Sequence, residues 1–155
     1  MSEDKATEDK AAVARDAWGA VFALVFSEAS HERMHGACES LGLTPGLMKA
    51  MLSMRPGLGR PMKELAGQWR CDASYVTSLV DGLEERGFVE RQAHPTDRRA
   101  KVVALTPLGE KTREQLLDML HDPPAWFDVL SVPERRTLRD LLRKLVAAAE
   151  AATEH

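Results

Sequence analysis

The sequence predicts a mainly α-helical protein with one small β-hairpin. Three observations carry this prediction. Apolar residues recur at helical spacing in several separate segments, two short β-like segments enclose a charged loop at 93–100, and long apolar stripes lie near both ends of the chain. The hairpin follows two short helices directly, so the order of elements is as informative as their type.

The composition indicates one ordinary globular domain. The chain has 155 residues, a hydrophobic content of 44% and a formal net charge of −3, which suit one core plus an oligomerisation element. The longest apolar run, "AVFALVF" at 20–26, is far shorter than the ~20 residues that span a bilayer. The charged start is unlike a signal peptide, and two cysteines are too few for a disulfide framework. We expect a cytoplasmic protein that contacts no membrane.

The first element is a helical segment at 9–37. It is more apolar than a lone surface helix needs, which indicates a partner helix. Its apolar face combines residues at helical spacing with two aromatic neighbours: Val13, Ala17, Val21, Leu24 and Val25, with Trp18 and Phe22.

A second helix begins at "LTPG". Thr44 can cap it, and Pro45 fits the first helical position, where the missing N–H costs nothing. This helix is expected to run to about Met54, where "RPGLGRP" at 55–61 interrupts it.

Two short helices follow at 61–69 and 72–87, joined by a tight link. Asp72 is a suitable N-cap, and Gly87 a suitable C-terminal stop. In the second of these helices one row of residues is expected to face the core: Val76, Leu79, Val80 and Leu83. The outward N-terminal end then presents Ala73, Ser74, Tyr75, Thr77 and Ser78.

The predicted hairpin pairs 88–92 with 101–106. A further helix starts at the Thr-Pro of 106–107, and the final helix starts where Ser131 and Glu134 have capping-box spacing. Its apolar stripe consists of Leu138, Leu141, Leu142, Leu145, Val146 and Ala149. Burial within one subunit would explain this stripe and the N-terminal one, but we favour a dimer interface formed by both.

Two helices followed by a hairpin with a basic loop are the layout of a winged helix-turn-helix. A helix fits the major groove and can present its N-terminal turn to base edges. A hairpin beside it can reach the minor groove, which attracts arginine where it is narrow. Segment 86–101 carries three net positive charges against −6 for the remainder, and phosphate attraction depends on such local charge. Arg98 and Arg99 would form the tip of the wing.

At this point the sequence resembles the MarR family of transcriptional regulators. The resemblance rests on "VTSLVDGLEERGFVERQAHPTDRRAKVVALTPLG" at 76–109, with its Gly-Phe-Val-x-Arg start, Asp-Arg-Arg wing and Leu-Thr-x-x-Gly exit, and extends more loosely over about 10–150. It implies a homodimer with dimerisation helices at 1–40 and 107–155 around a DNA-binding lobe at 41–106.

The resemblance also implies roles for individual residues. Helix 72–86 would enter the major groove of double-stranded DNA through Ser74, Tyr75, Thr77 and Ser78. One arginine of the pair Arg98 and Arg99 would enter the minor groove, and Asp97 would hold the loop in shape. Many relatives carry an arginine where this chain has Ser78, and serine cannot make the bidentate guanine contact. Base preference should therefore differ, or rest more on Ser74, Tyr75 and DNA shape.

The resemblance implies a non-enzymatic repressor without a cofactor. A small-molecule effector of unknown identity would release it from a pseudo-palindromic operator by changing the distance between the two recognition helices. The half-sites that these helices must match lie about 34 Å apart.

Several residues allow other interpretations. "HERMH" places His31 and His35 on one helical face and fits a metalloprotease motif, but its polar flanks argue against an active-site helix. The same histidines with Glu32, Cys38 and Glu39 offer an alternative, a zinc-responsive regulator. Cys71, just before the recognition helix, is a second candidate sensor. Three tryptophans, Trp18, Trp69 and Trp126, suit either a ligand cleft or the core.

Overall fold

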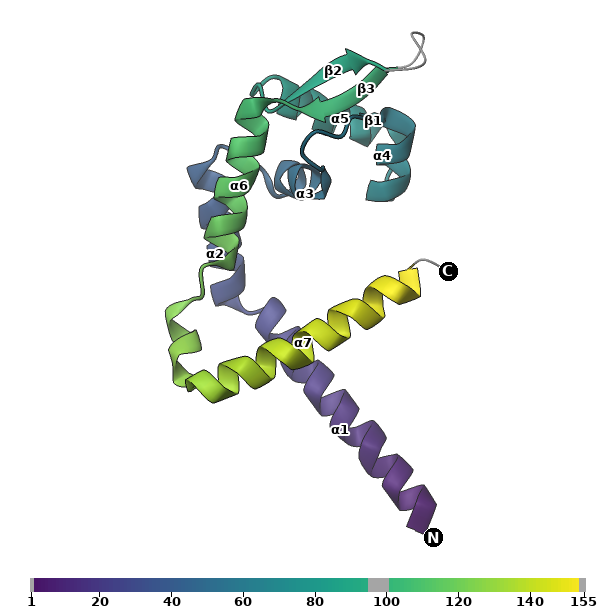
Figure 1. Ribbon diagram of the computed structural model, residues 1–155, viewed down its shortest axis with the longest axis vertical. Helices are drawn as coiled ribbons and strands as arrows, with labels where there is room; N and C mark the ends of the chain where they lie inside the picture. Colours follow the sequence, from purple (N-terminus) through teal and green to yellow (C-terminus); the bar gives the residue numbers. More distant parts are fainter. Residues whose placement is uncertain (1, 95–100, 154–155) are drawn as a thin grey trace. The chain divides into compact units, whose positions relative to one another are not determined.

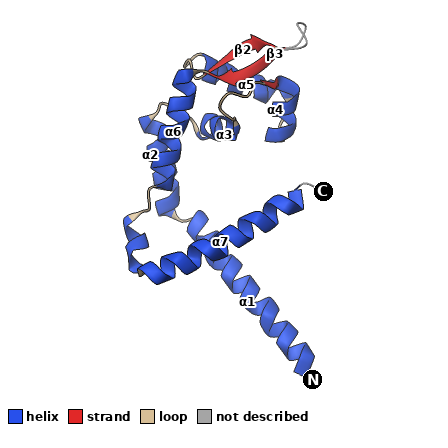
Figure 2. Cartoon of the chain, viewed as in Figure 1, coloured by secondary structure: helices blue, strands red, loops and turns tan. Residues whose placement is uncertain are grey.

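The chain folds into helices and one small sheet, in a computed structural model that describes the backbone of residues 2–94 and 101–153 and the side chains of 9–94 and 101–152. The elements, in chain order, are α1 (Ser2–Val25), α2 (Glu28–Ser40), α3 (Pro45–Ser53), β1 (Arg60–Pro61), α4 (Met62–Trp69), α5 (Ala73–Glu84), β2 (Val89–Ala93), β3 (Lys101–Leu105), α6 (Pro107–His121), the 3-10 helix η1 (Ala125–Val129) and α7 (Val132–Thr153) (Figures 1 and 2). The predicted fold class, mainly helical with a hairpin wing, is confirmed.

The chain divides into two compact units, Met1–His121 and Asp122–His155. The first holds α1 to α6 and the sheet, and the second holds η1 and α7. None of the helices in the described part of the chain is both long enough and apolar enough to cross a membrane.

Side-chain caps start the helices at the expected places. The Thr44 hydroxyl accepts a hydrogen bond from the Leu47 N–H at 3.3 Å at the start of α3, with Pro45 in the first turn. The expected helical segment 9–37, however, is two helices. Ser27 interrupts it because its hydroxyl accepts from the Ser30 N–H at 3.2 Å and thereby caps a new helix, α2.

The sheet has three antiparallel strands in the order β1-β3-β2. β2 and β3 form the predicted hairpin, with register from Val89↔Leu105 to Ala93↔Lys101. β1, which pairs Arg60 with Val103, was not predicted, because two residues have no periodicity to detect. A Cβ at Gly59 would lie 2.7 Å from a methyl of Val102, so glycine allows β1 to approach β3.

One hydrophobic core joins helices α2 to α6 and the sheet. α3, α4 and β2 each pack on α5, and α6 packs on α2, α3 and β3. The row predicted on α5 is fully part of this core, since none of its side chains is more than 8% exposed. The core consists of Ala37, Cys38, Leu43, Leu47, Met48, Ala50, Met51, Met54, Leu65, Val76, Leu79, Val80, Leu83, Phe88, Val89, Val103, Leu105 and Leu116.

The exit of the hairpin is locked to its entrance. The Thr106 N–H donates to the Phe88 carbonyl at 3.0 Å, and the Thr106 hydroxyl donates to the Gly87 carbonyl at 2.6 Å. The same hydroxyl oxygen accepts from the Gly109 N–H at 3.0 Å and so caps α6. A Cβ at Gly109 would lie 1.8 Å from the Phe88 carbonyl oxygen. Only glycine allows this approach between α6 and the hairpin.

In the second unit, one half of the predicted capping box is present. The Glu134 carboxylate accepts from the Ser131 N–H at 2.8 Å and from its hydroxyl at 2.5 Å, and these hydrogen bonds lower the pKa of Glu134. Arg135 lies over the Phe127 ring, 5.8 Å from its centroid, and pairs with Asp128 at 2.8 Å. These contacts join η1 to the start of α7.

Because Gly109 lies so close to the Phe88 carbonyl, adding one methyl group there should strongly reduce stability. Gly109→Ala should lower the free energy of unfolding by about 1–3 kcal/mol or more, because the neighbour is backbone and cannot move aside cheaply. The matched control is Gly67→Ala on α4, where an added Cβ meets nothing within 4 Å. That variant should gain about 0.5–1 kcal/mol from helix propensity. Urea denaturation measures both, and equal effects would contradict the constraint.

The cap of α5 predicts a pH dependence. The Ser74 hydroxyl, and then the Tyr75 N–H, lower the pKa of Asp72 below its ordinary 3.8 by hydrogen bonding to the carboxylate. This stabilisation is complete above the ordinary pKa and is lost as the pH falls through the lowered one. Asp72→Asn keeps a capping side chain without the charge. Wild type should therefore exceed it in melting temperature at neutral pH, and the difference should shrink as the pH falls below 3.8, the ordinary pKa. A difference independent of pH would contradict the assignment.

Candidate nucleic-acid interface

The N-terminal half of α5 presents a continuous polar face. All four residues expected to contact DNA, Ser74, Tyr75, Thr77 and Ser78, are exposed. They are exposed because the buried row on the opposite side fixes the rotation of the helix. Their contact with DNA stays a prediction.

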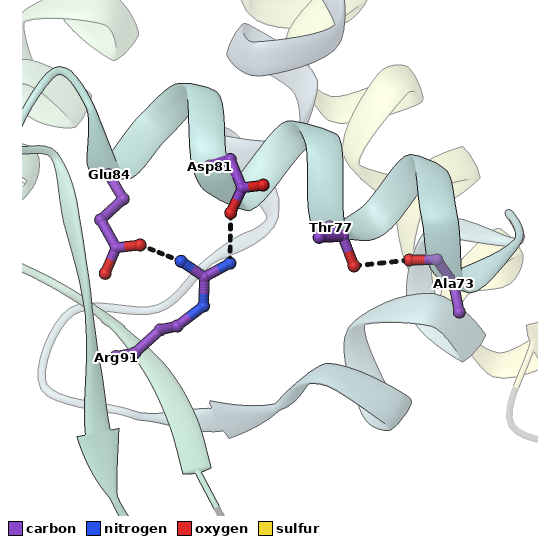
Figure 3. A network of polar contacts seen from close by, with 5 residues as sticks. All are labelled: Ala73, Thr77, Asp81, Glu84 and Arg91. Atoms are coloured by element: carbon purple, nitrogen blue, oxygen red, sulfur yellow. Dashed lines mark hydrogen bonds and ion pairs between the residues drawn. The ribbon is translucent and has the colours of Figure 1, made fainter.

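Two of these hydroxyl groups are already donating within the helix. The Ser74 hydroxyl donates to the Asp72 carboxylate at 2.6 Å. The Thr77 hydroxyl donates to the Ala73 carbonyl at 2.8 Å, as Figure 3 shows. Each hydroxyl has only one hydrogen, so these oxygens are left as acceptors toward a ligand. Acceptors in the major groove suit the amino groups of adenine and cytosine.

Tyr75 leans back over the start of α3 and is 50% exposed. A Cβ at Gly46 would lie 2.9 Å from the Tyr75 hydroxyl oxygen and 3.2 Å from a methyl of Leu79. The ring therefore combines the two roles considered for it: one part packs within the lobe, and the rest is open to a ligand.

Arg91 joins the hairpin to α5. Its guanidinium, on β2, pairs with Asp81 at 2.5 Å and with Glu84, and both carboxylates lie on the C-terminal half of the helix (Figure 3). The Arg91 side chain is only 25% exposed. This bridge fixes the base of the wing against the helix beside it.

Part of the positive charge counted in segment 86–101 belongs to arginines that bond to the lobe itself. Arg91 is held by carboxylates, and Arg86 donates to the Gly42 carbonyl at 2.9 Å and to the Gly82 carbonyl at 2.7 Å. Two of the five cations in this segment are therefore structural, since partners inside the lobe hold them. Lys101, the first paired residue of β3, is exposed.

The tip of the wing lies outside the described residues. The hairpin closes with the pair Ala93 and Lys101, and Asp97, Arg98 and Arg99 fall in the undescribed segment 95–100. Their roles remain predictions.

Two further cations flank α5 and were not predicted. Lys49 on α3 lines a groove with Tyr75 and Leu79, and Lys63 on α4 lines another with Ala73 and Thr77. One signal in the sequence could have found them: α5 itself contains no lysine or arginine, so a DNA-binding lobe must supply cations from its neighbours.

The histidine cluster does not assemble a metal site. His31 and His35 are exposed on α2, but Cys38 is buried, with its sulfur 3.6 Å from that of Met48. Burial raises the pKa of the Cys38 thiol, which disfavours the thiolate needed for a metal ligand or a redox sensor. Within 2–94 and 101–153, no three histidine, cysteine or acidic residues lie close enough together to hold a metal ion. The zinc-responsive and metalloprotease alternatives are therefore without support.

Trp69 packs within the lobe, where it also lines the groove beside Lys49. Its indole N–H donates to the Ser53 hydroxyl at 2.6 Å, and the ring packs against the core, as does Cys71. Trp18 on α1 and Trp126 on η1 are 67% and 44% exposed.

Comparison with known proteins agrees with this architecture. The family model of the MarR family matches residues 59–101. The chain is 33% identical over 114 residues to the HTH-type transcriptional regulator BilQ of Clostridium symbiosum, a match that covers 71% of this chain and 77% of that protein.

Two solved structures share the fold. The apo form of MarR from E. coli is 26% identical with a TM-score of 0.64, covering 82% of this chain and 95% of that one. A point mutant of MepR from S. aureus bound to an oligodeoxyribonucleotide is 22% identical with a TM-score of 0.58, covering 83% and 97%. The match to BilQ, the matching family model and the MarR structure agree, and the chain belongs to the MarR family of transcriptional regulators.

Proposed function

We propose that this regulator binds a pseudo-palindromic operator as a homodimer and represses transcription until an effector releases it. The observation that carries the proposal is the exposed polar face of α5, held outward by a fully buried row and braced by the hairpin through Arg91. The similar fold of a MepR mutant, which was solved bound to an oligodeoxyribonucleotide, supports DNA as the partner, and we propose the double-stranded form.

Exposed apolar side chains support the homodimer. On α7 they include Leu141, Leu142, Leu145 and Val146, each at least 41% exposed in the single chain. On α1 they include Val13, Trp18, Phe22, Leu24 and Val25, each at least 51% exposed. Full burial of one such side chain contributes about 1.5–3 kcal/mol, and a second copy of the chain would cover these surfaces. Residues 1–40 and 107–155 would then be the dimerisation parts around a DNA-binding lobe at 41–106.

Homodimerisation would set the distance between the two recognition helices. Half-sites one turn apart require about 34 Å between them. An effector that changes this distance would remove one subunit from its half-site and release the operator. Such a compound must weaken operator binding by the dimer. Spin labels on the two recognition helices measure the distance between them, and release of the operator without a change in this distance would argue against the mechanism.

The wing predicts the salt dependence of DNA binding. The double variant Arg98→Ala/Arg99→Ala should bind the duplex upstream of the protein's own gene more weakly than wild type. Its log–log slope against salt should be flatter by about 0.9 for each phosphate that the variant no longer neutralises. Fluorescence anisotropy measures both. The control Arg136→Ala/Arg143→Ala removes the same charge from exposed positions of α7. Equal slopes for the two variants would contradict the role of the wing.

The apolar face of α7 predicts a mutation that separates the subunits. Leu145→Glu should dissociate the dimer because it places a charge on each side of the apolar interface. Light scattering after size exclusion should then give about 17.2 kDa, the mass of one chain, rather than twice that. Ala147→Glu is the control, because it lies about 200° around the helix from Leu145 and is exposed. A monomeric wild type would contradict the homodimer itself.

A further inference from the structure

The recognition helix lacks the charge that DNA binding requires. α5 contains no lysine or arginine, and its only ionisable side chains apart from Tyr75 are Asp81 and Glu84, preceded by Asp72 at the cap. Duplex DNA carries one negative charge per about 1.7 Å of its axis. The polar face of α5 offers hydroxyl groups to bases but no cationic side chain to attract phosphates. Positive charge must therefore come from elements beside it.

The two lysines beside α5 lie on opposite flanks of its polar face. At about 100° per residue, Tyr75 and Leu79 mark one flank, and Ala73 and Thr77 mark the other, with Ser74 and Ser78 between them. The groove with Tyr75 and Leu79 is lined by Lys49 of α3, and the groove with Ala73 and Thr77 by Lys63 of α4. One cation therefore borders each edge of the surface that faces the bases.

Both ammonium groups are available for a ligand. Lys49 and Lys63 are exposed, and within the described part of the chain neither has a carboxylate partner within salt-bridge distance. This distinguishes them from Arg86, whose guanidinium donates to two backbone carbonyls, and from Arg91, which is paired with carboxylates of α5. It also distinguishes Lys63 from Arg60, which approaches Glu64 at 3.8 Å.

The two grooves suit lysine stems rather than an effector. Their volumes are about 110 and 250 Å³, below the ~300–1,000 Å³ that small-molecule pockets occupy. Their floors are mostly apolar, with Ala50 and Leu79 in one and Met62 and Val76 in the other. A lysine can lay its methylene chain along such a surface and extend its charge beyond it.

We infer that Lys49 and Lys63 form a phosphate clamp, each contacting the backbone of one DNA strand while α5 lies in the major groove between them. The groove is about 12 Å wide and a helix about 10–12 Å across, so the two strands border the two flanks of an inserted helix. The inference rests on the proposed DNA binding and adds its anchoring residues. These contacts read no sequence, since phosphates are the same at every base pair.

The test uses the full chain and needs no operator. Lys49→Gln, Lys63→Gln and their double variant remove charge and keep side-chain length. The probe is a labelled duplex of mixed sequence, about 30 base pairs long, which accommodates two half-sites one turn apart. Anisotropy titrations at several salt concentrations give the log–log slope. Each glutamine should flatten the slope by about 0.9 per subunit. Between 50 and 200 mM salt, the fold-loss of affinity should then be about three times smaller than for wild type for each phosphate that is no longer neutralised.

Two controls separate the clamp from general charge and from folding. Lys111→Gln removes the same charge from an exposed position on α6 and should leave the slope at the wild-type value. Lys49→Arg and Lys63→Arg keep the charge and should retain the wild-type slope. Unchanged melting temperatures for the glutamine variants show that weaker binding does not come from unfolding.

The outcomes distinguish this inference from the proposed function. If wild type binds with a steep slope and the glutamine variants equal Lys111→Gln, the clamp is wrong and DNA binding stands. If a second duplex of the same length but different sequence shows a different loss of affinity for the glutamine variants, the lysines read bases and the clamp is also wrong. If wild type binds no duplex even at low salt, both the proposed function and the clamp fail.

Discussion

Burial of one side of α5 is the constraint on which the rest of the lobe depends. Val76 and Val80 are at most 1% exposed, and Leu83 is completely buried. Each such side chain stabilises the folded chain by about 1.5–3 kcal/mol relative to exposure, far more than any surface contact of the same helix. The helix cannot rotate without exposing this row, so its polar residues must face outward. A surface that could read DNA is thus a consequence of the core.

The hairpin is held to its two neighbouring helices, α6 and α5, by contacts of two kinds. Backbone and glycine geometry joins the strands to α6, where Gly109 lies directly against the carbonyl of Phe88. Charge joins β2 to α5, through Arg91 with Asp81 and Glu84. Both carboxylates are partly exposed, so solvent screens this pairing and its contribution to stability is modest. Its main consequence is geometric, since it sets the direction in which the strands leave the helix.

The positions of the charged side chains matter more for this protein than its net charge. The chain is acidic overall, at −3, yet a regulator of transcription must approach a polyanion. Asp81 and Glu84 of α5 are paired with Arg91, and Asp72 caps the helix, while Lys49 and Lys63 are exposed beside the polar face. Screening within about 10 Å makes these local differences more important than the net charge.

The sequence by itself determined the features that depend on near neighbours in the chain. Thr44 with Pro45 and Asp72 start helices because a cap needs only the next three residues, and the buried row of α5 follows from helical spacing alone. The hairpin and the family resemblance around it were also visible without a structure. The motif includes Gly109, but only the structure shows that glycine is needed there because the Phe88 carbonyl lies so close.

Contacts between distant segments were decided only by the tertiary structure. β1 exists because Gly59 allows close approach to β3, and two residues carry no pattern of their own. Cys38 is separated from the neighbouring histidines because it packs against Met48. Whether an arginine or lysine bonds within the protein or is available to a ligand depends on which carboxylates and carbonyls the fold places beside it. Charge counted along a sequence cannot show this, because the partners of Arg86 and Arg91 are set by the packing of helices and strands.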